Sequence, residues 1–339
     1  MATLTHSDRT ATPVGTMQAV VQDRYGAPDV LRLEQTDRPA IEPDEVLLRV
    51  HAAGLDRGTW HLLTGTPYLM RVIGFGFRGP KNRVPGLDVA GTVVAVGSAV
   101  TRFAAGDEVF GISRGSFAEY AAAREDKLSV KPASLTFEQA AVVPVSALTA
   151  LQSLRDAGRV RAGQRVLVIG ASGGVGSYAV QLAKAFGTEV TAVASTAKLD
   201  LVRSLGADHV VDYTREDFAE GPERYDLVLD IGGSSPASRL RSALTDRGTL
   251  VFVGGENGGR VTGGMGRQLR AVGLSLFLRQ RLTMHATKER AADLLPITEL
   301  IEAGKVTPAL ERSYSLEQVP DALRRLEAGT VRGKVAVIP

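Results

Sequence analysis

The chain has 339 residues, and its 40 Lys and Arg residues nearly balance its 37 Asp and Glu residues, which leaves a formal net charge of +3. This near balance excludes the strong positive field that attracts nucleic acid, so no nucleic-acid partner is expected. There is no cysteine, which excludes disulfides, thiolate nucleophiles and Cys-ligated metals and is typical of a reducing compartment such as the cytoplasm.

The length of the chain exceeds what one hydrophobic core usually fills, so two domains are expected. The longest mostly apolar stretch, residues 140 to 151, contains Pro, Ser and Thr and is too short to span a bilayer, so no membrane association is expected. Residues 1–16 are rich in Thr and lack an apolar segment, which predicts a flexible tail rather than a signal peptide.

The first half of the chain alternates short apolar runs with turns. Strands are predicted over residues 17–21, 45–52, 88–96 and 107–110, and several are bounded by Gly or Pro. Many short strands with Gly-rich turns are typical of a small barrel.

From residue 165 the pattern changes to strands that alternate with helices. Strands are predicted over residues 165–170, 189–194, 226–231 and 249–253, with helices over 175–186 and 198–205. This alternation predicts an α/β fold in which a doubly wound parallel sheet of the Rossmann type has helices on both faces. A Gly-rich loop (254–266), helices over 293–303 and 320–328, and a strand over 334–338 complete the prediction.

A glycine-rich turn joins the first of these strands to its helix, with the sequence Gly170-Ala-Ser-Gly-Gly-Val-Gly176. Glycines let a backbone turn sharply and approach a pyrophosphate, and the helix N-terminus adds amide donors and the positive end of its dipole. Because the turn stands between a strand and an amphipathic helix, it predicts a dinucleotide site. The predicted cofactor-binding residues of the turn are Gly170, Ser172, Gly173, Gly174, Val175 and Gly176.

The end of the second strand indicates which dinucleotide binds. An NAD site usually carries an acidic residue about 20 positions after the turn, but Ser195 stands at that place. Ser195 and Lys198 can hydrogen-bond a 2′-phosphate, and Tyr213 after the third strand can reach the same group. The sequence therefore predicts NADP(H), while for Lys198 a solvated helix position is the alternative.

The chain resembles the medium-chain dehydrogenase/reductases, within them the zinc-independent quinone oxidoreductase-like group. The resemblance runs from about residue 17 to the end. The segments that carry it include VPGLDVAGTVVAVG (84–97), RFAAGDEVFG (102–111), GSFAEYAAA (115–123), AAVVPVSALTAL (140–151), VLVIGASGGVGSYAVQLAKAFGTEV (166–190) and GADHVVDY (206–213).

This resemblance implies a GroES-like β-barrel catalytic domain, residues 17–140 plus 285–339, with a nucleotide-binding domain of residues 141–284 inserted into it. Zinc-dependent members carry a Cys and a Gly-His-Glu around a catalytic metal, whereas this chain has Gly86-Leu87-Asp88 and no Cys. Its five histidines are scattered, so no metal site is expected.

The resemblance also suggests residues around the nicotinamide and the substrate. Relatives often show Asn-Pro-x-Asp where this chain has Asp56-Arg57-Gly58-Thr59, so Asp56 is a candidate acid, with helix capping as the alternative. Tyr68 is a candidate for polarising a carbonyl, with a packed loop aromatic as the alternative.

Five further residues complete the predicted cofactor environment. Thr149 is the candidate cofactor-contacting threonine, or a helix residue bonded to its own backbone. Gly254 offers backbone groups to the carboxamide, and Phe277, predicted on the last strand of the nucleotide domain, would form a cleft wall. Arg332 and Lys334 would approach the cofactor phosphates or face solvent.

Without zinc there is no strong Lewis acid, so the expected reaction is hydride transfer from NADPH to a quinone or an α,β-unsaturated carbonyl. The alternatives are a zinc-free alcohol or carbonyl dehydrogenase, and a non-catalytic NADPH-sensing or nucleic-acid-binding protein. The resemblance further implies a homodimer, with residues 274–278 predicted as an edge strand that pairs with its copy.

Overall fold

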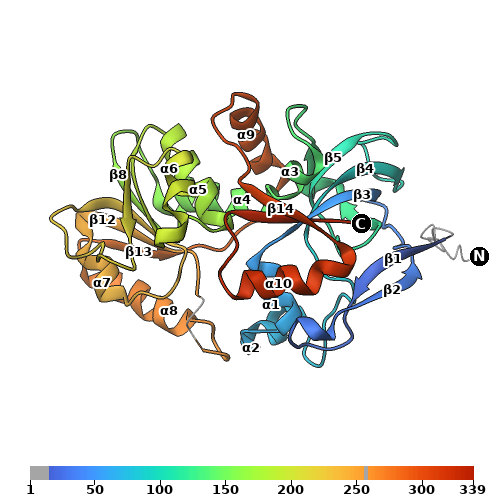
Figure 1. Ribbon diagram of the computed structural model, residues 1–339, viewed down its shortest axis with the longest axis horizontal. Helices are drawn as coiled ribbons and strands as arrows, with labels where there is room; N and C mark the ends of the chain where they lie inside the picture. Colours follow the sequence, from blue (N-terminus) through green and yellow to red (C-terminus); the bar gives the residue numbers. More distant parts are fainter. Residues whose placement is uncertain (1–14, 256–258) are drawn as a thin grey trace, which may run out of the picture.

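The computed structural model describes residues 15–255 and 259–339. The chain forms two lobes, and its C-terminal elements lie between and beside them (Figure 1). The predicted tail, apart from its last two residues, and part of the predicted loop 254–266 lie outside the described residues. The predicted domain boundaries stay a prediction, because the two sheets of the chain do not by themselves fix where each domain begins.

One lobe is a six-stranded parallel sheet in the order β10-β9-β8-β11-β12-β13. The chain enters at β8, adds β9 and β10 on one side, and then returns to add the other three strands on the opposite side. This is the doubly wound order predicted from the sequence, and it creates a switch point beside β8 where ligands bind. The strands are β8 (Arg165–Ile169), β9 (Glu189–Ala194), β10 (His209–Asp212), β11 (Tyr225–Asp230), β12 (Leu244–Phe252) and β13 (Arg281–Met284).

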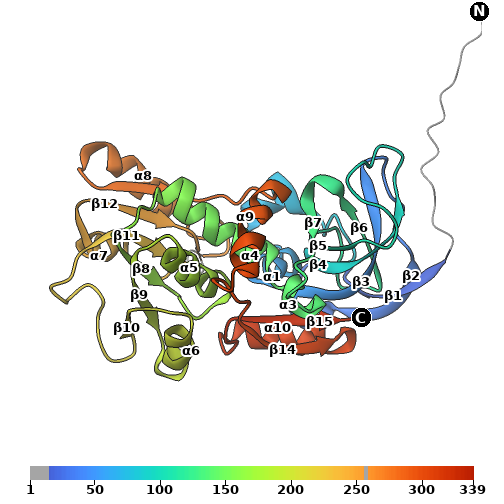
Figure 2. The ribbon, with the colours of Figure 1, turned by 90° about the horizontal axis from the view of Figure 1, so that it is seen from above.

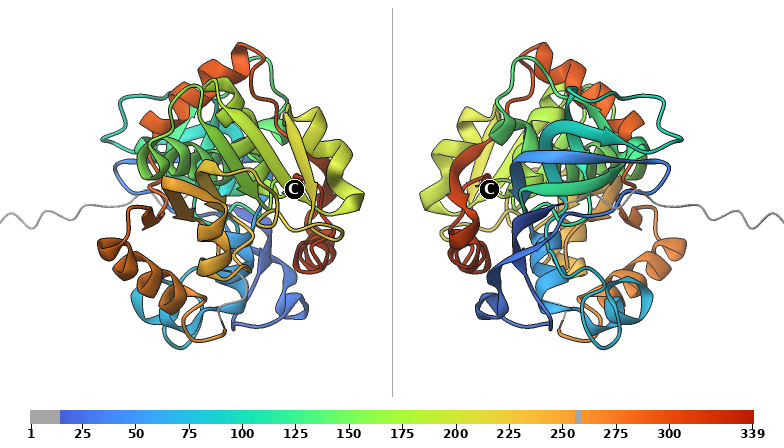
Figure 3. Two further views of the ribbon diagram at one scale, coloured as in Figure 1. Left: turned by 90° about the vertical axis from the view of Figure 1, so that its left-hand side faces the viewer. Right: turned by 90° about the vertical axis from the view of Figure 1, so that its right-hand side faces the viewer.

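Helices flank this sheet, as the left view of Figure 3 shows. They are α5 (Gly174–Ala185), α6 (Leu199–Ser204), α7 (Ala237–Ser242) and α8 (Met265–Leu274). The inner strands are buried on both faces: Val166 and Val168 pack in one hydrophobic cluster, and Leu167 in another. This two-sided burial is why the strands read as continuous apolar runs.

The other lobe is a barrel-like sheet in the order β14-β15-β3-β4-β5-β7, with β6 paired to β3. The hairpin of β1 and β2 stands beside it. The strands are β1 (Thr16–Val21), β2 (Arg32–Asp37), β3 (Glu45–Leu55), β4 (Asp88–Val96), β5 (Glu108–Ile112), β6 (Tyr120–Arg124), β7 (Leu128–Val130), β14 (Leu310–Ser315) and β15 (Lys334–Ile338). Since β15 runs antiparallel to β3, the end of the chain returns to its first half and extends this sheet.

The remaining helices are α1 (Arg57–Thr64), α2 (Tyr68–Met70), α3 (Phe137–Ala141), α4 (Pro144–Gln152), α9 (Ala291–Glu302) and α10 (Val319–Glu327). Helix α4 packs against both α5 and α9. One buried cluster contains Phe110 of the barrel, Leu151 of α4 and Val168 of the parallel sheet. The two lobes therefore share a continuous core, which fixes the barrel relative to the nucleotide sheet. Figure 2 shows α4 and α9 between the two lobes.

The structure corrects one element. An edge strand is expected over residues 274–278, as the last of the nucleotide sheet. Instead, α8 ends at Leu274, a 3₁₀ turn (Ser275–Phe277) follows, and the edge strand is β13. The amphipathic helix begins before this segment, and the helical backbone continues through most of it as the 3₁₀ turn.

Candidate functional site

The glycine-rich turn is defined by close backbone contacts. Gly170 follows β8 with a φ of +85°, which favours glycine, and Gly176 lies in the first turn of α5. A Cβ on Gly176 would stand only 2.2 Å from the carbonyl oxygen of Gly170. The strand and the helix thus approach too closely for any side chain, and the N-terminal amides of α5 face the turn.

A cavity of about 420 Å³ opens beside this turn at the carboxyl ends of the strands. The predicted residues Gly170, Ser172, Gly173, Ser195, Lys198 and Tyr213 all line it. Gly174, Val175 and Gly176 do not line this cavity but form the start of α5 behind it. The structure therefore brings together the glycine-rich turn and the residues that the sequence predicts to select the cofactor.

Sequence reasoning missed the rest of this cavity. Its other walls include Phe218, Gly232, Ser234, Ser235, Arg239 and Gly329. The Arg239 guanidinium stacks on the Phe218 ring and pairs with Asp217. These residues follow β10 and β11 or come from the barrel half, so no motif marks them in the sequence.

Lys198 is not a solvated helix residue. Its ammonium donates to the carbonyl oxygens of Gly329 and Val331, both at 2.7 Å, and burial lowers its pKa. The nearby Asp212 carboxylate at the end of β10 accepts hydrogen bonds from the Thr196 and Thr214 hydroxyls and does not line the cavity. Within the described part of the chain, the cavity wall carries no acidic side chain.

Lys334 neither faces solvent nor lines the cofactor cavity. It is buried, and its ammonium lies 3.3 Å from the buried Asp88 carboxylate, which also accepts the amide of Val145. Burial raises the pKa of Asp88 to about 7, although the Lys334 charge acts in the opposite direction. A Cβ on Gly174 would come within 2.9 Å of the Lys334 side chain, so this pair lies directly behind the glycine turn.

Thr149 lies in α4, and Gly254 follows β12. The Thr149 hydroxyl donates to the carbonyl of Val145 in its own helix and also lies 2.8 Å from the Thr287 hydroxyl. The Gly254 carbonyl accepts from the Gln268 amide, and a Cβ there would stand 2.0 Å from the carbonyl of Ile231. Their contact with a cofactor stays a prediction.

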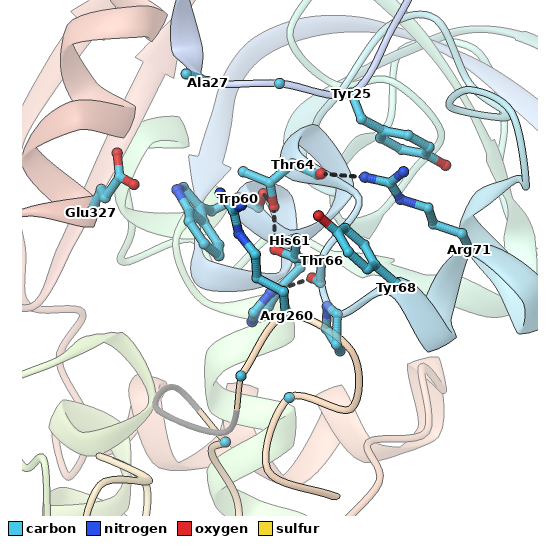
Figure 4. A pocket seen from close by; sticks show the side chains of 15 residues that line it. Tyr25, Ala27, Trp60, His61, Thr64, Thr66, Tyr68, Arg71, Arg260 and Glu327 are labelled. Carbon is cyan, nitrogen blue, oxygen red and sulfur yellow. Dashed lines mark hydrogen bonds between the residues drawn. The ribbon is translucent and has the colours of Figure 1, made fainter.

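A second cavity, of about 590 Å³, lies between the barrel half and the loop after β12. Tyr68 lines it, as predicted for a cleft residue, and Trp60, His61 and Thr64 project into it from α1 (Figure 4). The guanidinium of Arg71 lies between the rings of Tyr25 and Tyr68, at 4.4 and 4.6 Å from their centroids. This arrangement fixes the Tyr68 ring at the wall of the cavity.

The nucleotide half closes this cleft with residues 259–263. The amide of Tyr68 donates to the carbonyl of Arg260 at 2.8 Å, and the amide of Leu69 donates to that of Val261. Gly263 approaches Pro67 so closely that a Cβ would meet its ring at 2.6 Å. The cleft therefore has walls from both halves of the chain. Phe277 is not one of them: it lies on the 3₁₀ turn after α8 and is 86% exposed.

Two family models match the chain: the alcohol dehydrogenase GroES-like domain over residues 42–133, and the zinc-binding dehydrogenase over residues 205–337. The 2-methylene-furan-3-one reductase of Solanum lycopersicum is 35% identical over 95% of this chain and 79% of its own length. The chloroplastic NADPH-dependent alkenal/one oxidoreductase of Arabidopsis thaliana is 37% identical over 95% of this chain and 80% of its own. The structure of the quinone oxidoreductase from Coxiella burnetii, 29% identical, covers 96% of this chain and all of its own with a TM-score of 0.84.

The chain is a medium-chain dehydrogenase/reductase. It belongs to the quinone oxidoreductase-like group of that superfamily, as its relatives and its barrel-plus-Rossmann architecture show. It is thus an oxidoreductase that uses a nicotinamide cofactor. The cavity beside the glycine turn fits such a cofactor, because the close contact of Gly170 and Gly176 excludes side chains there and lets a pyrophosphate approach the backbone.

Zinc, which the name of one family model implies, does not fit the residues of this dehydrogenase/reductase. Leu87 stands where the motif of zinc-dependent members has an imidazole, and the adjacent Asp88 carboxylate is already paired with an ammonium. Across residues 15–255 and 259–339, no three His, Cys, Asp or Glu side chains gather into a possible metal site.

Asp56 is the cap of α1 in this dehydrogenase/reductase, which was the alternative to its role as an acid. Its Oδ1 accepts the amide of Thr59 at 2.8 Å, and Asp56 lines neither cavity. Its other oxygen, Oδ2, is buried and has no hydrogen-bond partner among the described residues. A buried carboxylate oxygen without a donor is costly, and the role of Asp56 as an acid stays a prediction.

Proposed function

We propose that this protein transfers a hydride from NADPH to a quinone or an α,β-unsaturated carbonyl compound without using a metal. The observation that carries the proposal is the cofactor cavity: Ser195, Lys198 and Tyr213 line it together with the glycine turn, and no acidic side chain of the described residues does. A 2′-phosphate would meet hydrogen-bond donors and a positive charge there, whereas an NAD site would place a carboxylate at this position.

The turn and α5 hold the pyrophosphate in this proposal. Gly170 and Gly176 permit the close approach, and the amides at the start of α5 donate to the phosphate oxygens. Bound NADPH supplies the hydride. The chain itself contributes orientation, because the shared core of the two lobes fixes the cleft relative to the turn.

The cleft suits a flat, conjugated acceptor. The rings of Trp60 and Tyr68 offer aromatic surfaces, and the Tyr68 hydroxyl can donate to an acceptor oxygen on which negative charge develops. Conjugation spreads this charge, so an acceptor of this kind needs no Lewis acid. A proton then comes from solvent or from the same hydroxyl.

The test is a panel of quinones, enones and simple aldehydes, offered with NADPH or NADH while absorbance of the reduced nicotinamide is followed. We expect oxidation of NADPH by quinones or enones, no turnover of simple aldehydes, weaker binding of NADH, and no loss of rate with a chelator. Turnover of alcohols or aldehydes would instead indicate the alternative dehydrogenase. NADPH binding with no turnover of any compound would indicate the non-catalytic alternative.

A homodimer is also part of this proposal. β13 is one of the two edge strands of the parallel sheet, and the exposed apolar side chains of Leu274, Leu276 and Phe277 lie just before it. A sheet edge flanked by apolar side chains suits pairing with a second copy. Sedimentation analysis at several concentrations would test it, and a single monomeric species would contradict it.

We also propose that the protein works in the cytoplasm, without nucleic-acid or membrane partners. The absence of cysteine supports this location. The small net charge supports the lack of a nucleic-acid partner. No helix of the described residues combines the length and the apolarity that crossing a bilayer requires. Fractionation of cells that produce the tagged protein would test the location.

A further inference from the structure

Residues 329–334, which join α10 to β15, form a segment that we call the C-terminal strap. It belongs to the barrel half, yet it lies against the cofactor turn of the nucleotide half. The amide of Gly333 donates to the carbonyl of Ser172, within the glycine-rich turn, at 2.8 Å. The strap therefore touches the backbone that would hold the pyrophosphate.

Three side chains hold the strap in place. The Lys198 ammonium donates to its carbonyls at Gly329 and Val331. The Arg332 guanidinium pairs with Asp200, which follows Lys198 in the nucleotide half. At its far end, the buried Lys334 pairs with Asp88 and packs under Gly174. Lys198 is thus the side chain that both lines the cofactor cavity and binds the strap.

Lys198 also has bonding capacity left for a ligand. An ammonium has three N–H donors, and two of those of Lys198 point at strap carbonyls. Burial of Lys198 lowers its pKa, the Arg332 charge acts in the same direction and the Glu311 charge opposes both, so a charged ammonium is held at a cost. A phosphate in the cavity would remove this cost and keep Lys198 charged and bonded to the strap.

We propose that the strap couples the two halves to the cofactor: a 2′-phosphate bound at Lys198 tightens the contact between residues 329–334 and the glycine turn. Lys198 is then a positioning residue as well as a phosphate ligand. This inference rests on the proposed use of NADPH. A cofactor without the 2′-phosphate would therefore hold the barrel half less firmly against the glycine turn. Because this contact orients the two halves during the reaction, NADPH should be preferred over NADH in kcat as well as in KM.

The direct test uses two fragments that carry no nicotinamide, 2′,5′-ADP and 5′-AMP, each at saturation with the full chain. Hydrogen exchange of peptides from residues 327–338 is followed by mass spectrometry. We expect 2′,5′-ADP to slow exchange in the strap about threefold or more relative to 5′-AMP, because local opening has become less favourable. The two ligands should give equal exchange in the remote strand β2.

Two variants sharpen this test. In Lys198→Met, the difference between the two ligands in the strap should disappear. Lys184→Met is the matched control, since it also removes a partly exposed lysine that is bonded to the chain, here through Asp208, on the same half. Lys184→Met should keep the ligand-dependent difference.

The failure of this inference can be told apart from failure of the proposed cofactor. If 2′,5′-ADP binds more tightly than 5′-AMP but the strap exchanges equally with both, the coupling is wrong and the NADPH preference stands. If 2′,5′-ADP binds no more tightly than 5′-AMP, both the coupling and the proposed preference for NADPH are wrong. Kinetics give a second readout: Lys198→Met should bring the kcat values with NADPH and NADH together, and a change in KM alone would overturn the positioning role.

Discussion

The two cavities of this protein are built in different ways. The cofactor cavity is formed mainly by short loops that follow successive strands of one parallel sheet, and the turn beside it is held by close backbone contact between Gly170 and Gly176. The cleft combines side chains from residues 25–71 of the barrel half with a loop from the other half, residues 255 and 259–263. One cavity is set by local backbone sterics, and the other by side chains that meet only after both halves have folded.

This difference suggests a division of roles. The glycine turn tolerates little change at Gly176, because a Cβ there meets backbone atoms that cannot move aside. A cleft lined by Trp60, Tyr68 and Arg260 can change its substrate without disturbing the fold. A substitution at Gly176 should therefore reduce cofactor binding and stability together, while substitutions in the cleft should change turnover alone.

The largest effect is expected at the Asp88–Lys334 pair, which lies behind the turn and joins the two halves. At pH 8, Lys334→Met leaves the buried Asp88 side chain without its counter-ion, so that it must stay charged without a partner or take up a proton, and breaking a buried pair in this way costs about 3–5 kcal/mol of the free energy of unfolding. The double variant Asp88→Asn/Lys334→Met keeps an acceptor for the Val145 amide and removes both charges, so it should recover most of this loss in urea unfolding. Equal losses in the single and double variants would contradict this.

The same pair gives a pH dependence with a defined sign. Burial raises the folded-state pKa of Asp88 from 3.8 to about 7, so between these values the folded chain binds a proton that the unfolded chain has lost. The contribution of Asp88 to stability is therefore present below the unfolded-state pKa and is lost as the pH rises through the folded-state pKa. Urea unfolding at several pH values should show this decline in the wild type, and Asp88→Asn should lack it.

The second-largest effect is expected in the glycine turn. Gly176→Ala places a Cβ 2.2 Å from the Gly170 carbonyl, which should cost about 1–3 kcal/mol of stability because the backbone must move. NADPH affinity, measured by fluorescence titration, should fall about 100-fold, since a misplaced turn no longer directs its amides at the phosphates. Gly173→Ala is the control for stability: its Cβ meets nothing closer than 3.5 Å, so the variant should unfold like the wild type.

A smaller effect is expected in the cleft. Tyr68→Phe removes the hydroxyl but keeps the ring beside Arg71, so kcat with quinones or enones should fall about tenfold or more while NADPH affinity stays unchanged. Tyr120→Phe is the matched control, because Tyr120 lines neither cavity. If Tyr68→Phe retained full kcat, the hydroxyl would have no part in the reaction.

The smallest effect is expected outside both cavities. Phe277→Ser changes a side chain that is 86% exposed, so stability should change by about 0.5 kcal/mol or less and NADPH affinity should not change. If the homodimer forms as proposed, light scattering should show a shift toward monomer. A loss of cofactor affinity without that shift would restore Phe277 to the cleft wall.

Most of the nucleotide half could be predicted from the sequence. The strand predicted over residues 189–194 has the bounds of β9, and the turn at Gly170 lies between β8 and α5 as expected. Helix α1, which carries Trp60 into the cleft, was missed, although Asp56 is a cap signal at its start. Arg239 and Gly329 were missed as cavity residues because they come from distant positions along the chain.

The sequence by itself determined the parallel sheet, the glycine turn and the family of this protein, because apolar periodicity and glycine spacing act over a few residues. Only the tertiary structure decided the surroundings of two lysines. Lys334 is buried against Asp88, and Lys198 is bonded to the strap. The physical reason is that the environment of a charge depends on which distant segments exclude water from it, and that is fixed only when the two halves pack together.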